Sequence, residues 1–377
     1  MKIKRAIERT PGGLMVVPLM LGALLNSLDQ AQVRWIVEAL WFYGAQEQEG
    51  KYSFLRIGGF TEPLFKNGAL ALIGLFLVCV GSQMNPRVGG RALKKGLLLM
   101  TTKWLLGVAA AWLFGKFCDP FNGWLGLSAV ALLASIANDN GGLYVALTKL
   151  YGHRSDVGAI AVISINDGPF LTLVGLGILG AKFPFLTFAA VLLPVLLGFV
   201  LGNLDGEIRE FLAPGENLLI PFFAFALGAN MDFGVFLNIK ILAGGVVLCL
   251  LTIALTFLGC ALVFRLFRER SLIGPAAECS TAGNAVLTPK AVALAAAAAA
   301  GAGLMSAEEA AAYQKVVDRA NCQVSISVLL TALFCPLVVW WVDRWQRRRG
   351  IDGREEEKAR SDEPSSAAAA KAEAAEK

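Results

Sequence analysis

Long apolar stretches separated by short polar loops make up most of the chain. Aspartate, glutamate, lysine and arginine are all missing from 68–84, 187–201 and 241–264. Because a helix needs about 20 mainly apolar residues to cross the hydrocarbon core of a bilayer, the pattern predicts an all-α integral membrane protein. The expected transmembrane helices, about ten in number, are 12–29, 64–85, 93–115, 121–149, 157–180, 184–204, 214–232, 240–266, 272–300 and 321–343.

Two polar regions depart from this pattern. The segment 30–60 is mixed in charge and is expected to form an external insertion, and residues 347–377 are expected to form a low-complexity cytoplasmic tail. Of the 377 residues, 56% are hydrophobic and 17% are charged, whereas a soluble domain has about 25% charged residues. The expected surroundings are therefore a lipid bilayer, and no nucleic-acid partner is expected.

Basic residues gather in alternate loops. With ten spans, five basic groups fall on one side of the membrane, and the remaining loops are sparser in basic residues or more acidic. Since loops rich in lysine and arginine stay in the cytoplasm, both termini are expected there. The five groups are Lys2–Arg9, Arg87–Lys95, Lys149–Arg154, Arg265–Arg270 and Arg344–Arg349.

Two short motifs occur twice, in the same order. Val-Pro-Leu-Met-Leu-Gly at 17–22 is similar to Leu-Pro-Val-Leu-Leu-Gly at 193–198, and Gly-Ser-Gln-Met-Asn at 81–85 is similar to Gly-Ala-Asn-Met-Asp at 228–232. Five spans separate each motif from its copy, and an odd number of spans inverts the second copy in the membrane. Inverted repeats are typical of secondary transporters, although short apolar strings can also match by chance. The expected five-helix repeats are 1–182 and 183–346.

A repeat of this kind predicts a matching pair of broken helices, at the fourth and ninth spans. Small polar residues and glycines interrupt the fourth span at 135–142 and the ninth at 278–284. Unwound backbone at membrane depth is stable only where it lines a cavity or packs inside protein, and freed amides and helix N-termini suit a carboxylate. The candidate substrate-binding residues in the two breaks are Asn138, Asn140, Gly141, Gly142, Thr281, Gly283 and Asn284.

Three acids lie at membrane depth, namely Asp139, Asp167 and Glu278. Ionisable residues are costly there and usually functional, so all three are candidate proton carriers. Each also has a structural interpretation. Asp139 can cap the following half-helix, Asp167 can form hydrogen bonds between helices, and Glu278 can lie near the membrane interface.

One lysine and three amides complete the candidate set. Lys103, midway along the third span, can pair with a substrate carboxylate or with a buried acid, or can extend its amine to the membrane surface. Asn166 lies in the fifth span, shortly before a helix-breaking proline. Gln83 and Asn230 occupy matching positions in the two repeats. These two amides can bind substrate or cap helix ends.

Motifs of enzymes and metal sites are not found. The chain has no phosphate loop or GxSxG elbow, and its single histidine, His153, and seven cysteines match no metal-ligand spacing. We therefore expect a carrier of a small molecule rather than an enzyme, with no bound cofactor. A proton is the expected coupling ion, and sodium is the alternative.

Several motifs also carry a resemblance to a known family over residues 1 to 345, except for the insertion 30–60. They are Ile3–Arg5, Pro11–Gly13, Val17–Leu19, Leu21–Leu24, Asn140–Tyr144, Gly168–Pro169, Gly202–Asp205, Pro221–Gly228, Ser280–Gly283 and Thr288–Pro289. In these motifs the chain resembles the 2-keto-3-deoxygluconate permease family.

The resemblance implies a bacterial inner-membrane symporter that takes up 2-keto-3-deoxygluconate, or a closely related sugar acid, together with protons. It also implies two inverted five-helix repeats, as in bile-acid and sodium/proton transporters, and alternating access to a site at the broken helices. Two other functions stay open. One is a sodium-coupled transporter of another small organic anion, and the other is a membrane sensor that binds a solute without moving it.

Overall fold

The structure is a computed structural model that describes Lys4, Ile7 and residues 13–47, 50–84, 90–166 and 168–355. Within these residues the chain is helical and contains no β-strand. Eight described helices are long and apolar enough to cross a membrane, and a bent pair around residue 167 makes nine if it counts as one span. A further apolar helix, Ala69–Gln83, is shorter. These helices confirm the prediction of an all-α integral membrane protein.

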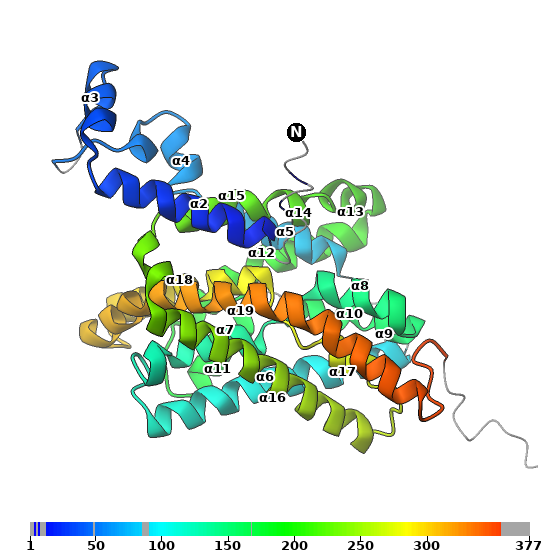
Figure 1. Cartoon of the computed structure of the whole chain (residues 1–377). Coiled ribbons are helices and arrows are strands. Elements are labelled where there is room, and N and C mark those ends of the chain that lie inside the picture. Colours follow the sequence, from blue (N-terminus) through cyan, green and yellow to red (C-terminus); the bar gives the residue numbers. More distant parts are fainter. Residues whose placement is uncertain are drawn as a thin grey trace, which may run out of the picture.

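One layer of the molecule consists of four apolar helices and two short linking helices, seen in the upper part of Figure 1. Helix α2 packs along α15, and α5 packs along α12. The layer comprises α2 (Gly13–Gln30), α5 (Ala69–Gln83), α12 (Phe185–Leu204), α13 (Gly206–Leu212), α14 (Gly215–Leu218) and α15 (Ile220–Gly228). We call it the four-helix layer.

Four glycines let these helices approach closely. A Cβ atom on Gly22 would collide with the backbone of α15, and one on Gly228 would collide with the backbone of α2. Gly81 and Gly198 have the same relation across α5 and α12. In the sequence motifs, Gly22 matches Gly198 and Gly81 matches Gly228. Each contact therefore joins the first predicted repeat to the second with the helices exchanged, as a two-fold relation between the repeats would require.

The second layer, which we call the core layer, contains the broken helices and lies below the first in Figure 1. Helix α16 packs against both α6 and α19, α7 packs against α6, and α18 packs against α19. The layer comprises α6 (Gly90–Phe117), η2 (Trp124–Gly126), α7 (Ala129–Ala137), α8 (Gly141–Tyr151), α9 (Arg154–Gly158), α10 (Ile160–Ile163), η3 (Ser164–Asn166), α11 (Phe170–Ile178), η4 (Phe233–Leu237), α16 (Ile239–Leu266), α17 (Ile273–Ala277), η5 (Gly283–Leu287), α18 (Thr288–Gly301) and α19 (Ala307–Arg347).

The last helix is longer than the sequence pattern predicts. The predicted span 321–343 lies within α19, which begins at Ala307, so the helix extends beyond the predicted span at its N-terminal end. Ser306 Oγ accepts a hydrogen bond from Glu309 N (3.1 Å) and caps the helix. The following residues are rich in alanine and glutamate, which favour helix. At 1.5 Å per residue the helix is about 60 Å long, so it extends well beyond a hydrocarbon core of about 30 Å.

The insertion after α2 is held by one buried carboxylate. Asp29 accepts hydrogen bonds from Ser53 Oγ (2.7 Å), Phe54 N (2.9 Å) and Leu55 N (3.1 Å). In Figure 1 the insertion projects beyond the end of α2. Its short helices are α3 (Arg34–Phe42), η1 (Phe54–Arg56) and α4 (Thr61–Phe65). Helix α4 is separate from α5, so the second apolar helix starts at Ala69 rather than at the expected residue 64.

The described basic segments meet at one end of the molecule. Glu269 accepts hydrogen bonds from Lys94 (2.8 Å) and Arg91 (3.2 Å). Lys95 forms an ion pair with Asp156 (2.7 Å). Burial alone would raise the pKa of Glu269, but its two basic partners hold that pKa below its ordinary value. The structure thus gathers charges that the topology prediction assigns to one side of the membrane.

Some predicted features lie outside the described residues. Asp167 is one of them. The same holds for residues 85–89 and for residues 356–377, which include most of the predicted tail. These predictions stay as they stand.

Candidate substrate and coupling site

Both predicted breaks are present in the core layer. Helix α7 ends at Ala137 and α8 begins at Gly141. In the ninth span, α17 ends at Ala277 and regular helix resumes only after η5. Asn140 links the two breaks, because its amide donates to Thr281 O (3.3 Å) while its oxygen accepts from Leu143 N (3.2 Å) and caps α8. The prediction that the fourth and ninth spans are broken is confirmed.

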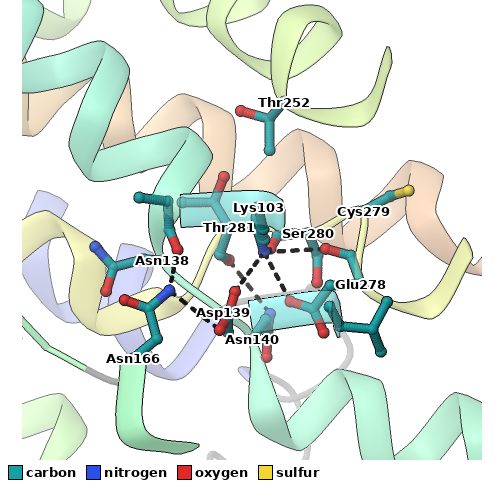
Figure 2. Close-up of polar contacts among 12 residues, drawn as sticks. Lys103, Asn138, Asp139, Asn140, Asn166, Thr252, Glu278, Cys279, Ser280 and Thr281 are labelled. Carbon is teal, nitrogen blue, oxygen red and sulfur yellow. Dashed lines mark hydrogen bonds and ion pairs between the residues drawn. The ribbon is translucent and has the colours of Figure 1, made fainter. Parts of the chain in front are cut away.

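A lysine from α6 lies between the breaks and touches an acid from each. Lys103 Nζ is 2.9 Å from Glu278 Oε1 and 3.3 Å from Asp139 Oδ1. It also donates to Glu278 O (3.0 Å) and Ser280 O (2.8 Å). Figure 2 shows the ammonium at the centre of these oxygens. All three ionisable side chains are buried, so Lys103 pairs with acids and does not extend to the membrane surface.

Two asparagines link the fourth span to the fifth, and one of them bonds Asp139. Asn166 Nδ2 donates to Asp139 Oδ2 (3.1 Å) and to Ala137 O. Asn138 Nδ2 donates to Ala134 O (3.0 Å), and its oxygen accepts from Gly168 N (3.3 Å). The fourth span is therefore tied to the fifth through the Asn166 side chain and the Gly168 amide, while the Nδ2 of Asn138 bonds back to its own helix.

A cluster of hydroxyl groups lies where the two breaks meet, a place that we call the crossing, and the sequence singles out only Thr281 among its members. Ser135 Oγ is within hydrogen-bonding distance of Thr252 (3.1 Å), Thr281 (3.0 Å) and Ser327 (2.7 Å). Thr331 Oγ1 accepts from Thr281 N (3.0 Å). A signal does exist in the sequence, since Ser327 and Thr331 are one helical turn apart within an apolar span. Single hydroxyls of this kind are too common in membrane helices to single out.

A cavity of about 1280 Å³ lies between the two layers. Phe76, Val80 and Gln83 line it from the four-helix layer. The first break lines it with 139–142, and the second with 282–284. Asp139 thus contributes to the cavity wall, although its side chain is fully buried, whereas Lys103 and Glu278 are not among the lining residues.

The cavity extends to the basic end of the molecule. Arg91, His153 and Arg154 line it there. At the opposite end the two layers are in apolar contact, where Leu19 and Met231 belong to the same buried cluster as Val324 of α19. The described structure therefore gives the breaks access to the end that carries the basic groups.

The two amides at matching repeat positions do not share a role. Gln83 lines the cavity and donates to Arg209 O (2.8 Å). Asn230 is not among the lining residues, and it donates to Lys66 O (2.7 Å) and Ala226 O (2.9 Å). The structure brings seven of the predicted site residues to the cavity, namely Gln83, Asp139, Asn140, Gly141, Gly142, Gly283 and Asn284.

Comparison with known proteins shows which family the chain belongs to. The sequence model for 2-keto-3-deoxygluconate permease matches residues 52–348, which is most of the chain. The chain belongs to the 2-keto-3-deoxygluconate permease family. A permease moves a solute across a membrane, so membership confirms the prediction of a carrier rather than an enzyme.

Curated relatives of this permease family match nearly the full length. 2-keto-3-deoxygluconate permease 1 of Salmonella typhimurium is 41% identical over 359 residues, covering 93% of this chain and 98% of the relative. The permease of Bacillus subtilis is 35% identical, covering 91% and 94%. The permease of Tolumonas auensis is 32% identical, covering 90% and 91%. The resemblance predicted from short motifs is confirmed.

Proposed function

We propose that this permease takes up 2-keto-3-deoxygluconate, or a closely related sugar acid, together with a proton across the bacterial inner membrane. The observation that carries the proposal is the cavity whose lining joins both broken helices and Asp139. The names of the full-length relatives support the substrate. The basic end faces the cytoplasm in this proposal, so the structure corresponds to an inward-facing state.

The cavity has the chemistry that a sugar acid requires. Helix α8 begins at Gly141 beside the cavity, so its first amides can bind a carboxylate. Asn140 and Asn284 line the same region and can bond hydroxyl groups. Arg91 and Arg154 give the cavity entrance a positive potential that attracts an anion. The volume exceeds the roughly 300–1,000 Å³ of typical small-molecule sites, so substrate and water fit together.

Charge balance supports proton coupling. One lysine pairs with two acids, which leaves one excess negative charge at membrane depth when both acids are ionised. Binding one proton removes that charge, and an uncompensated charge there is expensive. Of the two acids, Asp139 is the one that contributes to the cavity wall. Its side chain is buried, so in this proposal it exchanges the proton with the cavity when the transport cycle exposes it. Asp167 stays a candidate for a second proton site.

The two-layer arrangement supports alternating access as the transport mechanism. The glycine contacts hold α2 to α15 and α5 to α12, so the four-helix layer can move as a unit. Polar contacts hold the breaks together within the core layer. We propose that relative movement of the layers opens the apolar contact at Met231 and closes the cavity at the basic end. Both bound ligands would then face the other side.

Uptake into proteoliposomes tests the proposal. Labelled 2-keto-3-deoxygluconate should accumulate when a pH gradient is imposed and equilibrate without one. A panel of other sugar acids and a sodium gradient should give weaker or no accumulation. Accumulation that follows the sodium gradient and ignores pH would favour the sodium-coupled alternative, and saturable binding without any uptake would favour a sensor.

A further inference from the structure

The ammonium of Lys103 lies in a cage made of oxygen atoms. Four oxygens lie within 3.3 Å, namely Oε1 and O of Glu278, O of Ser280 and Oδ1 of Asp139. We propose that Lys103 fills a built-in site for a monovalent cation, so that the wild-type protein has no sodium site at the crossing. Shortening this side chain would open that site to sodium.

The ligand types support this interpretation. Hard cations are bound in proteins by carboxylate and backbone carbonyl oxygens, and here two oxygens are of each type. An ammonium has three N–H donors, so four surrounding oxygens exceed what it can satisfy. The carbonyls come from the break after α17 and are free of helix hydrogen bonds in the way that coordination requires. Figure 2 shows all of these groups converging on Nζ.

The other carboxylate oxygen of Glu278 is positioned to bind a cation once the Lys103 side chain is shortened. Oε2 of Glu278 is buried and accepts no hydrogen bond from the described part of the chain. Glu278 itself is only 1% exposed. Rotation of this carboxylate would give a small ion both of its oxygens, which the ammonium does not use.

Charge also favours a replacement ion. With Lys103 present and both acids ionised, the site carries one positive and two negative charges. With alanine and one sodium ion, the total is the same. Without any cation, two acids would be left unpaired in a buried site, and buried acids of this kind are strongly destabilising. The variant therefore has a large driving force for binding any cation that fits.

The consequence for coupling rests on the function proposed above. A carrier whose cation is covalently attached cannot release that cation to the other side of the membrane. The remaining mobile charge is then a proton on Asp139, and sodium has no role in the wild-type cycle. The cation site itself does not depend on which sugar acid is carried.

Thermal unfolding of the purified full-length protein in detergent tests the site without substrate. Melting is measured in NaCl from about 1 to about 100 mM, with choline chloride holding ionic strength constant. Lys103→Ala should show a saturable rise of a few degrees with sodium. The wild type should show none. Lys103→Met fills the space with an uncharged side chain. Its melting temperature should need at least about tenfold more sodium than that of Lys103→Ala to reach half of its rise.

Three results would overturn the inference. They are a saturable sodium response in the wild type, a Lys103→Ala response that choline reproduces, and equal responses in the alanine and methionine variants. If Lys103→Ala does not fold, the double variant K103A/D139N carries one buried acid fewer and is used instead. It should show the same preference for sodium over choline. Because no sugar acid is present, a wrong substrate assignment would leave these results unchanged.

Discussion

The two breaks at the crossing differ in what they face. The first, at 138–140, places Asp139 in the cavity wall with its side chain buried, and its own Asn140 caps the next half-helix. In the second break, the carboxylate of Glu278 and the backbone carbonyls of Glu278 and Ser280 point toward Lys103 instead. Glu278 lies behind the cavity wall, at 2.9 Å from the ammonium. The comparison teaches that two breaks that lie side by side can present different groups: the first contributes to the cavity wall, and the second surrounds Lys103 with oxygen atoms. In the function proposed above, the first break carries the mobile proton and the second holds the fixed charge.

Removing the shared cation should have the largest effect. In sodium-free buffer, Lys103→Ala leaves two buried acids without a partner, which costs about 3–5 kcal/mol of stability. Uptake should be lost as well. Melting temperature and uptake are measured together, with Lys116→Ala as a control at the exposed end of the same helix. Equal melting of the two variants would show that the ion pairs at the crossing are not what holds the breaks.

Replacing the two acids separately should split their roles. Asp139→Asn should abolish accumulation driven by a pH gradient while keeping exchange of labelled for unlabelled substrate, because the cavity keeps its shape but loses the group that binds the proton. Glu278→Gln should lower the melting temperature more than Asp139→Asn does, since it removes the shorter contact to Lys103. Identical effects of both substitutions on uptake and melting would contradict the division between the breaks.

The four-helix layer contrasts with the crossing, because its stability depends on close packing of helices rather than on charge. Gly81→Leu should destabilise the protein by about 1–3 kcal/mol, because a side chain there meets the backbone of α12. Gly74→Leu on the same helix is the matched control, since a Cβ at Gly74 meets no atom within 4 Å. Thermal melting compares them. A similar loss in both variants would mean that the leucine acts through the helix itself and not through packing.

The smallest effect is expected at the basic end, in Glu269→Gln. The folded protein lowers the pKa of this carboxyl, so its stabilising effect is present at neutral pH and lost as pH falls through the lowered value. Its partners are partly exposed, so the loss is about 1 kcal/mol or less. Melting of the variant and the wild type should differ near pH 7 and converge in acid. A difference that grows in acid would reverse the assigned sign.

Much of this architecture was predictable because membrane helices depend on composition. Uncharged stretches predict the spans, and Asn138 to Gly142 predict a break because asparagine and glycine do not sustain helix. The partner of Lys103 was not predictable. Glu278 lies 175 residues away in the chain, and several buried acids were equally plausible partners.

Other features depend on packing that a single sequence does not reveal. Gln83 and Asn230 match in sequence, yet only Gln83 lines the cavity. The hydroxyl cluster around Ser135 joins four segments, and apart from Thr281 none of its members stands out among the serines and threonines of the apolar spans. The early start of α19 was missed because its polar first turns resemble a loop. Their capping serine and high alanine content are local signals that outweigh polarity.

Substrate-driven proton movement is the most direct test of the role of Asp139. Proteoliposomes containing a lumenal pH indicator receive external 2-keto-3-deoxygluconate with no pH gradient imposed, and with membrane voltage clamped by potassium and its ionophore. The lumen of wild-type vesicles should acidify when the sugar acid is added, and vesicles with Asp139→Asn should take up substrate without acidification. Acidification by the Asp139→Asn protein at the wild-type rate would contradict the assignment of Asp139 as the proton-binding group.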